Sequence, residues 1–583
     1  MESKRRWPGC LLKLFVAFAI VLALFVYLVL VYPMWGAIPR GARGGPVPLT
    51  PAWALECWVW EDDVNTAAFT LELLEDYRAN DFPVRTVLID SPWSTRYNDF
   101  IVDEARFPEP AAFFNRLEDE GYRVVLWMTS MVNSRNPDTA VQDASDWHRD
   151  AADRGYLVGG DHQAKWWKGY GGFIDYTNPE AMAWWRGLQR QVLERGVDGW
   201  KLDGSATLLG KTQRFFWPYR KAHAGILTTR RYMDLYYREE YRHGLTMNPD
   251  FITMSRALDS PLPLGHPEGF APLDAAPVNW VGDNKHTWDD ASRGLERAVR
   301  VILDSAKLGY NVIGSDVGGY HGGGEIPPRL YIRWAQFSTF CGLFLNGGHG
   351  ERRMSRRTPE ELGIIREFSW LHMELVPYMF SHVVAGHEGG PPLMRPLDAK
   401  YHYLFGDALL VAPIYEDADT RAVTLPAGRW RYWFDDARVI EGPVTFTREF
   451  PLDEYPVYVR DGAIVPMYVE RAYTSIGDRD WKGFLALNLY PDGGDHTFRV
   501  RHPDDNGRSA TDVTMRGRAP LLVRLDGAKQ PHILRVLAAS KPAGVSLDGV
   551  VLDEGVAWRY DPESRRLIVR TTAYSTGEYE IDW

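Results

Sequence analysis

The chain has 583 residues, which is too long for one hydrophobic core, so we expect several domains. Hydrophobic residues make up 45% and charged residues 25%, a balance that excludes large-scale disorder. The net charge of −11 argues against a nucleic-acid partner, because nucleic-acid binders need a basic surface. The 3 cysteines lack metal-ligand spacing and exclude a disulfide framework, leaving open a single bridge between Cys57 and Cys341.

Residues 14–32 form an uncharged apolar run that is long enough to cross a membrane. Basic residues up to Lys13 precede it, which indicates a cytoplasmic N-terminus. A cleaved signal peptide is the alternative, but its apolar region is shorter and ends at an Ala-x-Ala-like site, which is missing here. We therefore expect a signal anchor over residues 1–36 and a linker over 37–51. The chain would be a single-pass type II membrane protein whose body lies on the lumenal, periplasmic or extracellular side.

Beyond the linker, strand-like apolar runs alternate with helix-like segments. We expect strands at residues 53–60, 84–90, 123–128, 196–203, 251–255, 278–281 and 311–315 and at the end of 332–345. We expect helices at 66–80, 110–121, 179–195, 227–243 and 295–308, at the start of 332–345, and at 362–385. Eight strands alternating with helices predict an α/β domain, a (β/α)8 TIM barrel over residues 52–388.

After residue 390 the pattern changes to short alternating strands separated by turn residues, among them 408–413, 429–434, 456–459 and 463–467. This pattern is typical of an all-β sandwich. We expect two such domains, a proximal sandwich over residues 389–468 and a distal sandwich over 469–583.

Polar residues follow the predicted strands at the point where each strand ends. They are Asp90, Asp203, Arg256, Asp283, Asp316 and His349. In a (β/α)8 barrel these strand ends meet on one rim, where catalysis takes place. Taken alone, an Asp such as Asp203 could equally cap a helix or bond within a turn.

Carboxylates gathered in one pocket are electrostatically costly and are kept mainly for metal binding or acid–base chemistry. No metal-ligand spacing stands out, so we expect no metal and no cofactor. Glycoside hydrolysis uses two carboxyl groups, one as nucleophile and one as a proton donor that needs a raised pKa. The 23 Trp residues also suggest flat platforms for sugars, although most of them can be ordinary core residues.

Several motifs make the chain resemble glycoside hydrolase family 31, the retaining α-glycosidases. The motifs begin at Ile174 (IDYTNPE), Gly199 (GWKLD), Trp280 (WVGDN), Gly314 (GSDVGGY), Leu375 (LVPY), Pro391 (PPLMRP), Phe405 (FGDALLVAP) and Tyr458 (YVRDGAIVP). The resemblance implies that Asp203 is the nucleophile and Asp283 the acid/base. It also implies that Asp90, Arg256, Asp316 and His349 bind the sugar, with Trp127 and Trp280 as walls. The same family pattern places two β-sandwiches after the barrel.

The chain departs from the family pattern in three places. The β-sandwich that usually precedes the barrel is missing or reduced to a linker, so the substrate entrance is expected to differ. Gly204-Ser205-Ala206 follows the nucleophile where family α-glucosidases usually have Met-Asn-Glu. Lys201 lies two residues before Asp203, on the same face of the strand, where it can reach sugar hydroxyls or merely pair with Asp203.

A Lys at this position resembles α-xylosidases and α-galactosidases more than α-glucosidases. Together with the anchor, it gives a layout similar to the myogenesis-regulating glycosidase type, a type II membrane α-galactosidase. We therefore expect a retaining α-glycosidase acting on an oligosaccharide or glycoconjugate, with α-galactosides first and α-xylosides or α-glucosides next. A transglycosylase and a non-catalytic glycan-binding scaffold of the same fold remain alternatives. The sequence does not indicate an oligomeric state.

Overall fold

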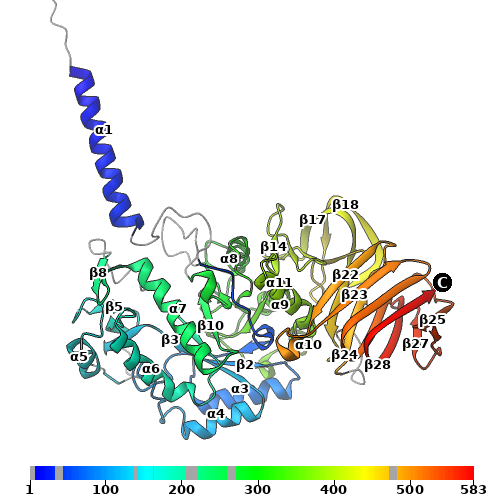
Figure 1. Ribbon diagram of the computed structural model, residues 1–583, viewed down its shortest axis with the longest axis horizontal. Coiled ribbons are helices and arrows are strands. Elements are labelled where there is room, and N and C mark those ends of the chain that lie inside the picture. Colours follow the sequence, from blue (N-terminus) through cyan, green and yellow to red (C-terminus); the bar gives the residue numbers. More distant parts are fainter. Residues whose placement is uncertain are drawn as a thin grey trace, which may run out of the picture.

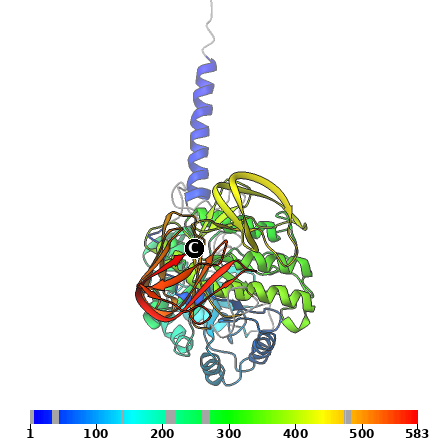
Figure 2. The same cartoon turned by 90° about the vertical axis from the view of Figure 1, so that its right-hand side faces the viewer.

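A computed structural model describes residues 7–32, 44–136, 142–143, 145–161, 163–204, 219–258, 271–471, 474 and 482–583. A barrel with surrounding helices, coloured blue to green in Figure 1, forms one part of the body. Two β-sheets in yellow to red lie beside it, and Figure 2 views the body from their side.

The barrel is closed by eight strands in the order β1-β13-β12-β11-β10-β7-β3-β2, and every neighbouring pair is parallel. The strands are β1 (Trp58–Val59), β2 (Thr86–Ile89), β3 (Arg123–Met128), β7 (Gly199–Leu202), β10 (Ile252–Arg256), β11 (Val278–Trp280), β12 (Ile313–Asp316) and β13 (Leu343–Asn346). A parallel closed barrel brings the carboxyl ends of all its strands to one rim, which confirms the predicted fold class.

Helices alternate with these strands along the chain. They are α3 (Ala67–Ala79), α4 (Pro110–Asp119), α6 (Pro179–Leu193), α7 (Thr229–Met247), α8 (Leu295–Lys307), α9 (Pro328–Thr339), α10 (Pro359–Glu374) and α11 (Val376–His387). Local sequence fixes several helix starts: Asn178 caps α6 through its side chain, and Thr358 with Glu361 forms a capping box on α10.

Two predicted elements differ in the structure. The run 53–60 was expected to be one strand, but Ala52–Leu55 forms a 3-10 turn and only Trp58–Val59 is β1. This turn lets Trp53 stack on Trp58, with ring centroids 6.1 Å apart. The single helix expected at 362–385 is two helices that meet at Leu375, because Pro377 has no amide hydrogen to continue the bonding of α10.

The long segment between β3 and α6 folds into its own small structure. It contains β4 (Met131–Arg135), α5 (Ser145–Asp153), β5 (Ala164–Trp166) and β6 (Gly169–Phe173). The three strands form a sheet in the order β4-β6-β5. A separate hairpin, β8 (Tyr219–Ala222) with β9 (Gly225–Thr228), precedes α7.

Two antiparallel-rich sheets follow the barrel. The first has six strands: β14 (Met394–Pro396), β15 (Tyr403–Phe405), β16 (Leu409–Val411), β17 (Thr420–Tyr432), β18 (Asp435–Glu449) and β19 (Val457–Arg460). The second has nine: β20 (Ile464–Tyr468), β21 (Leu485–Leu489), β22 (Asp495–Arg501), β23 (Ala510–Gly517), β24 (Leu521–Leu537), β25 (Gly544–Leu547), β26 (Val550–Val551), β27 (Trp558–Asp561) and β28 (Arg566–Asp582). The expected proximal sandwich, residues 389–468, includes β20, but β20 pairs with β21 of the nine-stranded sheet.

Near the N-terminus, α1 (Trp7–Val26) continues in a π-helical turn, Tyr27–Val31, and stands apart from the body (Figure 1). The stretch Gly9–Val29 is long and apolar enough to cross a membrane, with a mean hydropathy of 2.7. A signal sequence would pass the same test. The bridge left open between Cys57 and Cys341 is not formed, because both residues are buried free thiols.

Candidate active site

The polar residues that follow the barrel strands lie together on the rim. Asp203 follows β7, Arg256 ends β10, and Asp283 lies three residues beyond β11. Because β10 lies between β7 and β11 in the barrel, the guanidinium of Arg256 is placed between the two carboxylates.

Arg256 bonds to both carboxylates through one nitrogen atom. Its Nη2 lies 3.3 Å from Oδ1 of Asp203 and 3.2 Å from Oδ1 of Asp283. These two oxygens are therefore at most 6.5 Å apart, the sum of the two distances, and are closer unless the nitrogen lies on the line between them. Asp203 also accepts hydrogen bonds from the indole of Trp127 at 3.2 Å and from its neighbour's amide, Gly204 N, at 2.8 Å.

Lys201 lies on β7, two residues before Asp203, and is almost fully buried. Its Nζ donates to Oδ2 of Asp90 at 2.6 Å, so its direct partner is Asp90 and not Asp203. The ammonium also lies 4.0 Å from the ring centroid of Trp60 and 5.4 Å from that of Trp280. Burial acts to lower the pKa of Lys201, but the nearby carboxylates, Asp90 first, outweigh burial and raise it, so Lys201 is charged.

Asp316 ends β12 and is buried on the same rim. Its Oδ1 accepts a hydrogen bond from Nε1 of Trp60 at 3.1 Å. Burial, and next the charge of Asp283, raise the pKa of Asp316 to about 7 against the opposing charge of Lys201. This carboxyl therefore exchanges its proton near neutral pH.

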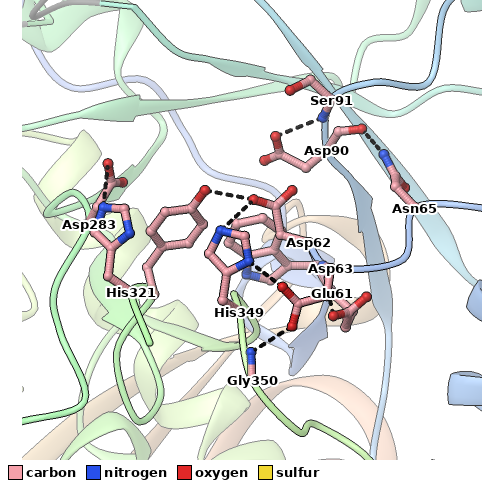
Figure 3. A network of polar contacts seen from close by, with 12 residues as sticks. Glu61, Asp62, Asp63, Asn65, Asp90, Ser91, Asp283, His321, His349 and Gly350 are labelled. Carbon is pink, nitrogen blue, oxygen red and sulfur yellow. Dashed lines mark hydrogen bonds and ion pairs between the residues drawn. The ribbon is translucent and has the colours of Figure 1, made fainter. Parts of the chain in front are cut away.

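His349, after β13, joins a second set of acidic groups (Figure 3). Its Nδ1 lies 2.6 Å from Oδ1 of Asp63 and its Nε2 lies 3.4 Å from Oδ2 of Asp62. The hydroxyl of Tyr320 donates to the same Asp62 oxygen at 2.6 Å. Burial and the charge of Asp90 raise the pKa of Asp62 to about 7.

The electrostatics of Asp283 differ from our expectation. We expected a raised pKa for a proton donor. Burial does act in that direction, but the charges of Arg256 and Lys201 outweigh it, so the pKa of Asp283 lies below its ordinary value. Nε2 of His321 lies 3.9 Å from the other carboxylate oxygen of Asp283. Figure 3 shows the two side chains facing each other. The shared bond to Arg256 is the physical reason for the difference.

All nine residues selected from the sequence belong to one connected network. They are Asp90, Trp127, Lys201, Asp203, Arg256, Trp280, Asp283, Asp316 and His349. Trp60 connects Asp316 to Lys201, and Tyr320, which stacks on Trp60, connects it to the Asp62 that contacts His349. The ring of Trp280 joins its two halves, because it lies 4.8 Å from the guanidinium of Arg256 and 5.4 Å from the ammonium of Lys201. In the part of the chain that the structure describes, no group of three or more His, Cys, Asp or Glu side chains has an arrangement that could hold a metal ion.

The network also contains residues that the sequence analysis did not select. Trp60 and Asp62 lie just beyond β1, and Tyr320 lies in the loop after β12. An acidic run directly after the first strand was the signal for Asp62. Sequence alone does not show which member of the run Glu61-Asp62-Asp63 turns toward the pocket.

Two family models match consecutive parts of the chain. The model described as the glycosyl hydrolases family 31 TIM-barrel domain matches residues 47–382, and the family 31 C-terminal domain matches residues 392–465. An alpha-xylosidase of Emericella nidulans is 26% identical over 73% of this chain and 54% of its own length. Human neutral alpha-glucosidase AB is 24% identical over 90% of this chain and 57% of its own. The chain therefore spans little more than half the length of these relatives.

Solved structures share the fold. A Flavobacterium johnsoniae GH31 dextranase superimposes with a TM-score of 0.80, at 20% identity, over 92% of this chain and 72% of its own. A cycloalternan-forming enzyme from Listeria monocytogenes gives a TM-score of 0.78, at 20% identity, over 92% of this chain and 55% of its own.

Proposed function

Because the chain belongs to glycosyl hydrolases family 31, we propose that it is a retaining α-glycosidase that removes a terminal α-linked sugar. The observation that carries this proposal is the shared bond of Asp203 and Asp283 to Arg256. Retaining glycosidases place their two carboxyl groups about 5–5.5 Å apart, and inverting ones about 6.5–9.5 Å apart. The limit of 6.5 Å on the two oxygens here favours retention.

In the proposed reaction Asp203 attacks the anomeric carbon while Asp283 donates its proton to the leaving oxygen. The glycosidic bond breaks and a glycosyl ester forms on Asp203. Asp283, now a carboxylate, takes a proton from water as the water oxygen attacks the same carbon and releases Asp203. Two inversions leave the sugar with its α configuration. Arg256 holds both carboxylates in place and balances their charge.

The glycone would lie against the buried charged groups of the pocket. Lys201 and Asp90 form an ion pair, Asp316 ends β12, and His349 follows the neighbouring strand β13 on the same rim. Charged donors and acceptors that are held in position suit several adjacent hydroxyl groups, and the rings of Trp127 and Trp280 would form the walls.

Lys201 and the relatives point to different sugars as the glycone. Lys201 before the nucleophile favours an α-galactoside or an α-xyloside by resemblance. The relatives described above carry the names alpha-xylosidase and alpha-glucosidase, so they give no support to the α-galactoside. The test therefore treats the α-galactoside, the α-xyloside and the α-glucoside equally and includes an α-N-acetylgalactosaminide beside them.

Aryl α-galactoside, α-xyloside, α-glucoside and α-N-acetylgalactosaminide substrates test the activity directly. We expect release from one of them, and a loss of at least about 100-fold in turnover in both Asp203→Asn and Asp283→Asn. Asp146→Asn, which changes a 91% exposed carboxylate on α5, is the matched control. Near-normal turnover in Asp203→Asn would refute the assignment.

Two other functions would give different results. A transglycosylase forms the same covalent ester but passes the sugar to an acceptor sugar, so product analysis with added acceptor separates it from a hydrolase. A non-catalytic scaffold would cleave none of the substrates, and a sugar that raises the melting temperature without being cleaved would then identify it.

We further propose that the helix Gly9–Val29 anchors the protein as a single-pass type II membrane protein. The catalytic body would lie on the lumenal, periplasmic or extracellular side. Protease protection of an epitope placed after residue 583 tests this topology. In sealed vesicles whose interior corresponds to the lumen, protection of the epitope from added protease supports the topology, and digestion contradicts it.

A further inference from the structure

Tyr236 lies in the middle of α7, and its side chain is fully buried. Its hydroxyl donates a hydrogen bond to the main-chain oxygen of Asp203 at 3.0 Å and lies 3.3 Å from the main-chain oxygen of Met128. Met128 ends β3, and Asp203 follows β7, the neighbouring strand of the barrel. A single phenol on a helix therefore contacts the ends of two barrel strands, one of which carries the proposed nucleophile.

The peptide group between Asp203 and Gly204 connects this hydrogen bond to the carboxylate of the nucleophile. The amide of Gly204 donates to Oδ1 of Asp203 at 2.8 Å, the same oxygen that Arg256 contacts. Because a peptide group is planar, fixing the direction of its carbonyl also fixes the direction of its amide hydrogen. Gly204 has a φ of 92°, and glycine restricts its own backbone less than any other residue, so the plane of this peptide needs a bond from outside. Tyr236 supplies that bond.

Neighbouring residues hold the phenol of Tyr236 in place. Its ring lies 6.2 Å from that of Tyr176, the third residue of the IDYTNPE motif, to which the proposed reaction gives no role. The hydroxyl of Tyr176 donates at 2.5 Å to the buried carboxylate of Glu240, which lies one helical turn beyond Tyr236 on α7. Trp185 and Gln189 of α6 donate to the same carboxylate at 2.9 and 2.6 Å. These bonds fix the part of α7 that carries Tyr236 against α6 and the motif.

We propose that Tyr236 is a positioning residue: by bonding the carbonyl of Asp203 it orients the amide of Gly204, which in turn orients the nucleophilic carboxylate. This inference rests on the proposed function, which makes Asp203 the nucleophile, and adds a residue that acts on it through the main chain. Burial raises the pKa of Tyr236 well above its ordinary value, so the hydroxyl keeps its hydrogen at every pH of an assay. Without this hydroxyl the peptide can turn, and the carboxylate loses its alignment with the anomeric carbon.

Tyr236→Phe tests the inference, because it removes the hydroxyl and keeps the buried ring. On the aryl α-glycoside that the full-length, detergent-solubilised protein cleaves fastest, we expect kcat to fall about 10–100-fold, in line with a misplaced reacting group. KM should stay within about twofold, because the glycone would be bound by other side chains, those of Lys201, Asp90 and Asp316. 4-Aminophenylalanine at position 236 keeps a hydrogen-bond donor where the hydroxyl was and should recover most of kcat.

Tyr232→Phe is the matched control, one helical turn earlier on α7. The hydroxyl of Tyr232 donates to the main-chain oxygen of Ile174 at 2.9 Å, and this side chain is buried as well. Each variant removes one donor from a buried main-chain oxygen, so the midpoint of urea unfolding should fall by a similar amount in both. The two midpoints also show that both variants are folded. Only Tyr236→Phe should lower kcat, and Tyr232→Phe should keep the wild-type value.

Equal falls in kcat in the two variants would overturn the inference, because a loss of stability in α7 would then explain both. An unchanged kcat in Tyr236→Phe, or a rise in KM alone, would overturn it as well, and so would a failure of 4-aminophenylalanine to restore kcat. If the wild-type protein cleaves none of the four aryl substrates, the proposed function falls and this inference with it, a result distinct from the others.

Discussion

The carboxylates of Asp203 and Asp283 accept hydrogen bonds from the same nitrogen atom, Nη2 of Arg256. One cation therefore sets both the spacing and the charge of the pair. It keeps the two oxygens within 6.5 Å of each other and contributes to holding the pKa of Asp283 below its ordinary value. The geometry suits a double displacement, and the charge restricts the pH range in which Asp283 can donate a proton.

Replacing Arg256 should change the pH profile as well as the rate. kcat/KM reports the free enzyme, so its basic limb follows the pKa of the proton donor. Because the pKa of Asp283 is lowered, we expect kcat/KM of the wild-type protein to rise as the pH falls from 7 to 5. In Arg256→Gln the main opposing charge is gone, so the basic limb should move to higher pH while the rate falls about 10–100-fold with the lost charged hydrogen bonds.

Arg149→Gln removes an exposed guanidinium from α5 and serves as the control for this profile. A basic limb that stays in place in Arg256→Gln would mean that Arg256 does not set the pKa of Asp283.

The buried pair of Lys201 and Asp90 should behave as a unit in stability measurements. Removing one partner leaves the other charge buried and unpaired, so we expect Lys201→Met and Asp90→Asn each to lower the free energy of unfolding by about 3–5 kcal/mol. The double variant loses the pair as a whole and should be less destabilised than the sum of the two, by about 0.5–3 kcal/mol. Denaturant unfolding of all four proteins measures this coupling. Additive losses would show that the 2.6 Å contact contributes nothing.

The raised pKa of Asp316 predicts a stability that depends on pH. The folded protein holds this proton up to about pH 7, whereas an ordinary Asp releases it near 3.8. The stabilisation of the folded state by this bound proton is therefore fully present below pH 3.8 and is lost as the pH rises to about 7. Asn cannot ionise, so the melting temperature of Asp316→Asn relative to wild type should increase steadily from pH 4.5 to 7.5.

The melting temperature of Asp316→Asn must be compared with that of the wild type at each pH, because buried histidines change the stability of both proteins with pH in the opposite direction. Burial lowers the pKa of His372 to about 4, so its contribution is present above pH 6.5 and is lost as the pH falls toward 4. A constant difference between Asp316→Asn and wild type across this range would contradict the assignment of a raised pKa.

Gly347 should tolerate no side chain, because Trp60 occupies the space. A Cβ atom there would lie 1.5 Å from Cδ1 of Trp60, the indole that donates to Asp316 and lies over Lys201. Gly347→Ala should displace the ring, cost about 1–3 kcal/mol of stability and lower kcat/KM more than tenfold. Gly363→Ala, in the open face of α10, is the control and should be neutral or up to about 1 kcal/mol more stable. Equal activities of the two variants would contradict this role of Trp60.

The sequence was sufficient to predict the barrel and most of the polar residues on its rim. Continuous apolar runs mark parallel strands, and β3 has the predicted bounds, Arg123–Met128. Polar residues at the ends of such runs led to the residues that the network connects. The bounds of the short β1 were harder to predict, because one continuous apolar and aromatic run contains both a 3-10 turn and the strand.

Contacts between strands could not be read from the sequence. That Arg256 bonds both Asp203 and Asp283, and that Lys201 pairs with Asp90, depends on which strands are neighbours and on their register. The lowered pKa of Asp283 follows from those contacts, so a prediction from its chemical role alone gave the opposite direction.

The anomeric configuration of the first sugar released tests the central claim most directly. Proton NMR during hydrolysis of the best aryl α-glycoside separates the α-anomer from the β-anomer before mutarotation mixes them. A double displacement through Asp203, with Asp283 within reach of the same Arg256 nitrogen, predicts the α-anomer first. Initial release of the β-anomer would show a single displacement by water and would contradict the roles given to both carboxylates.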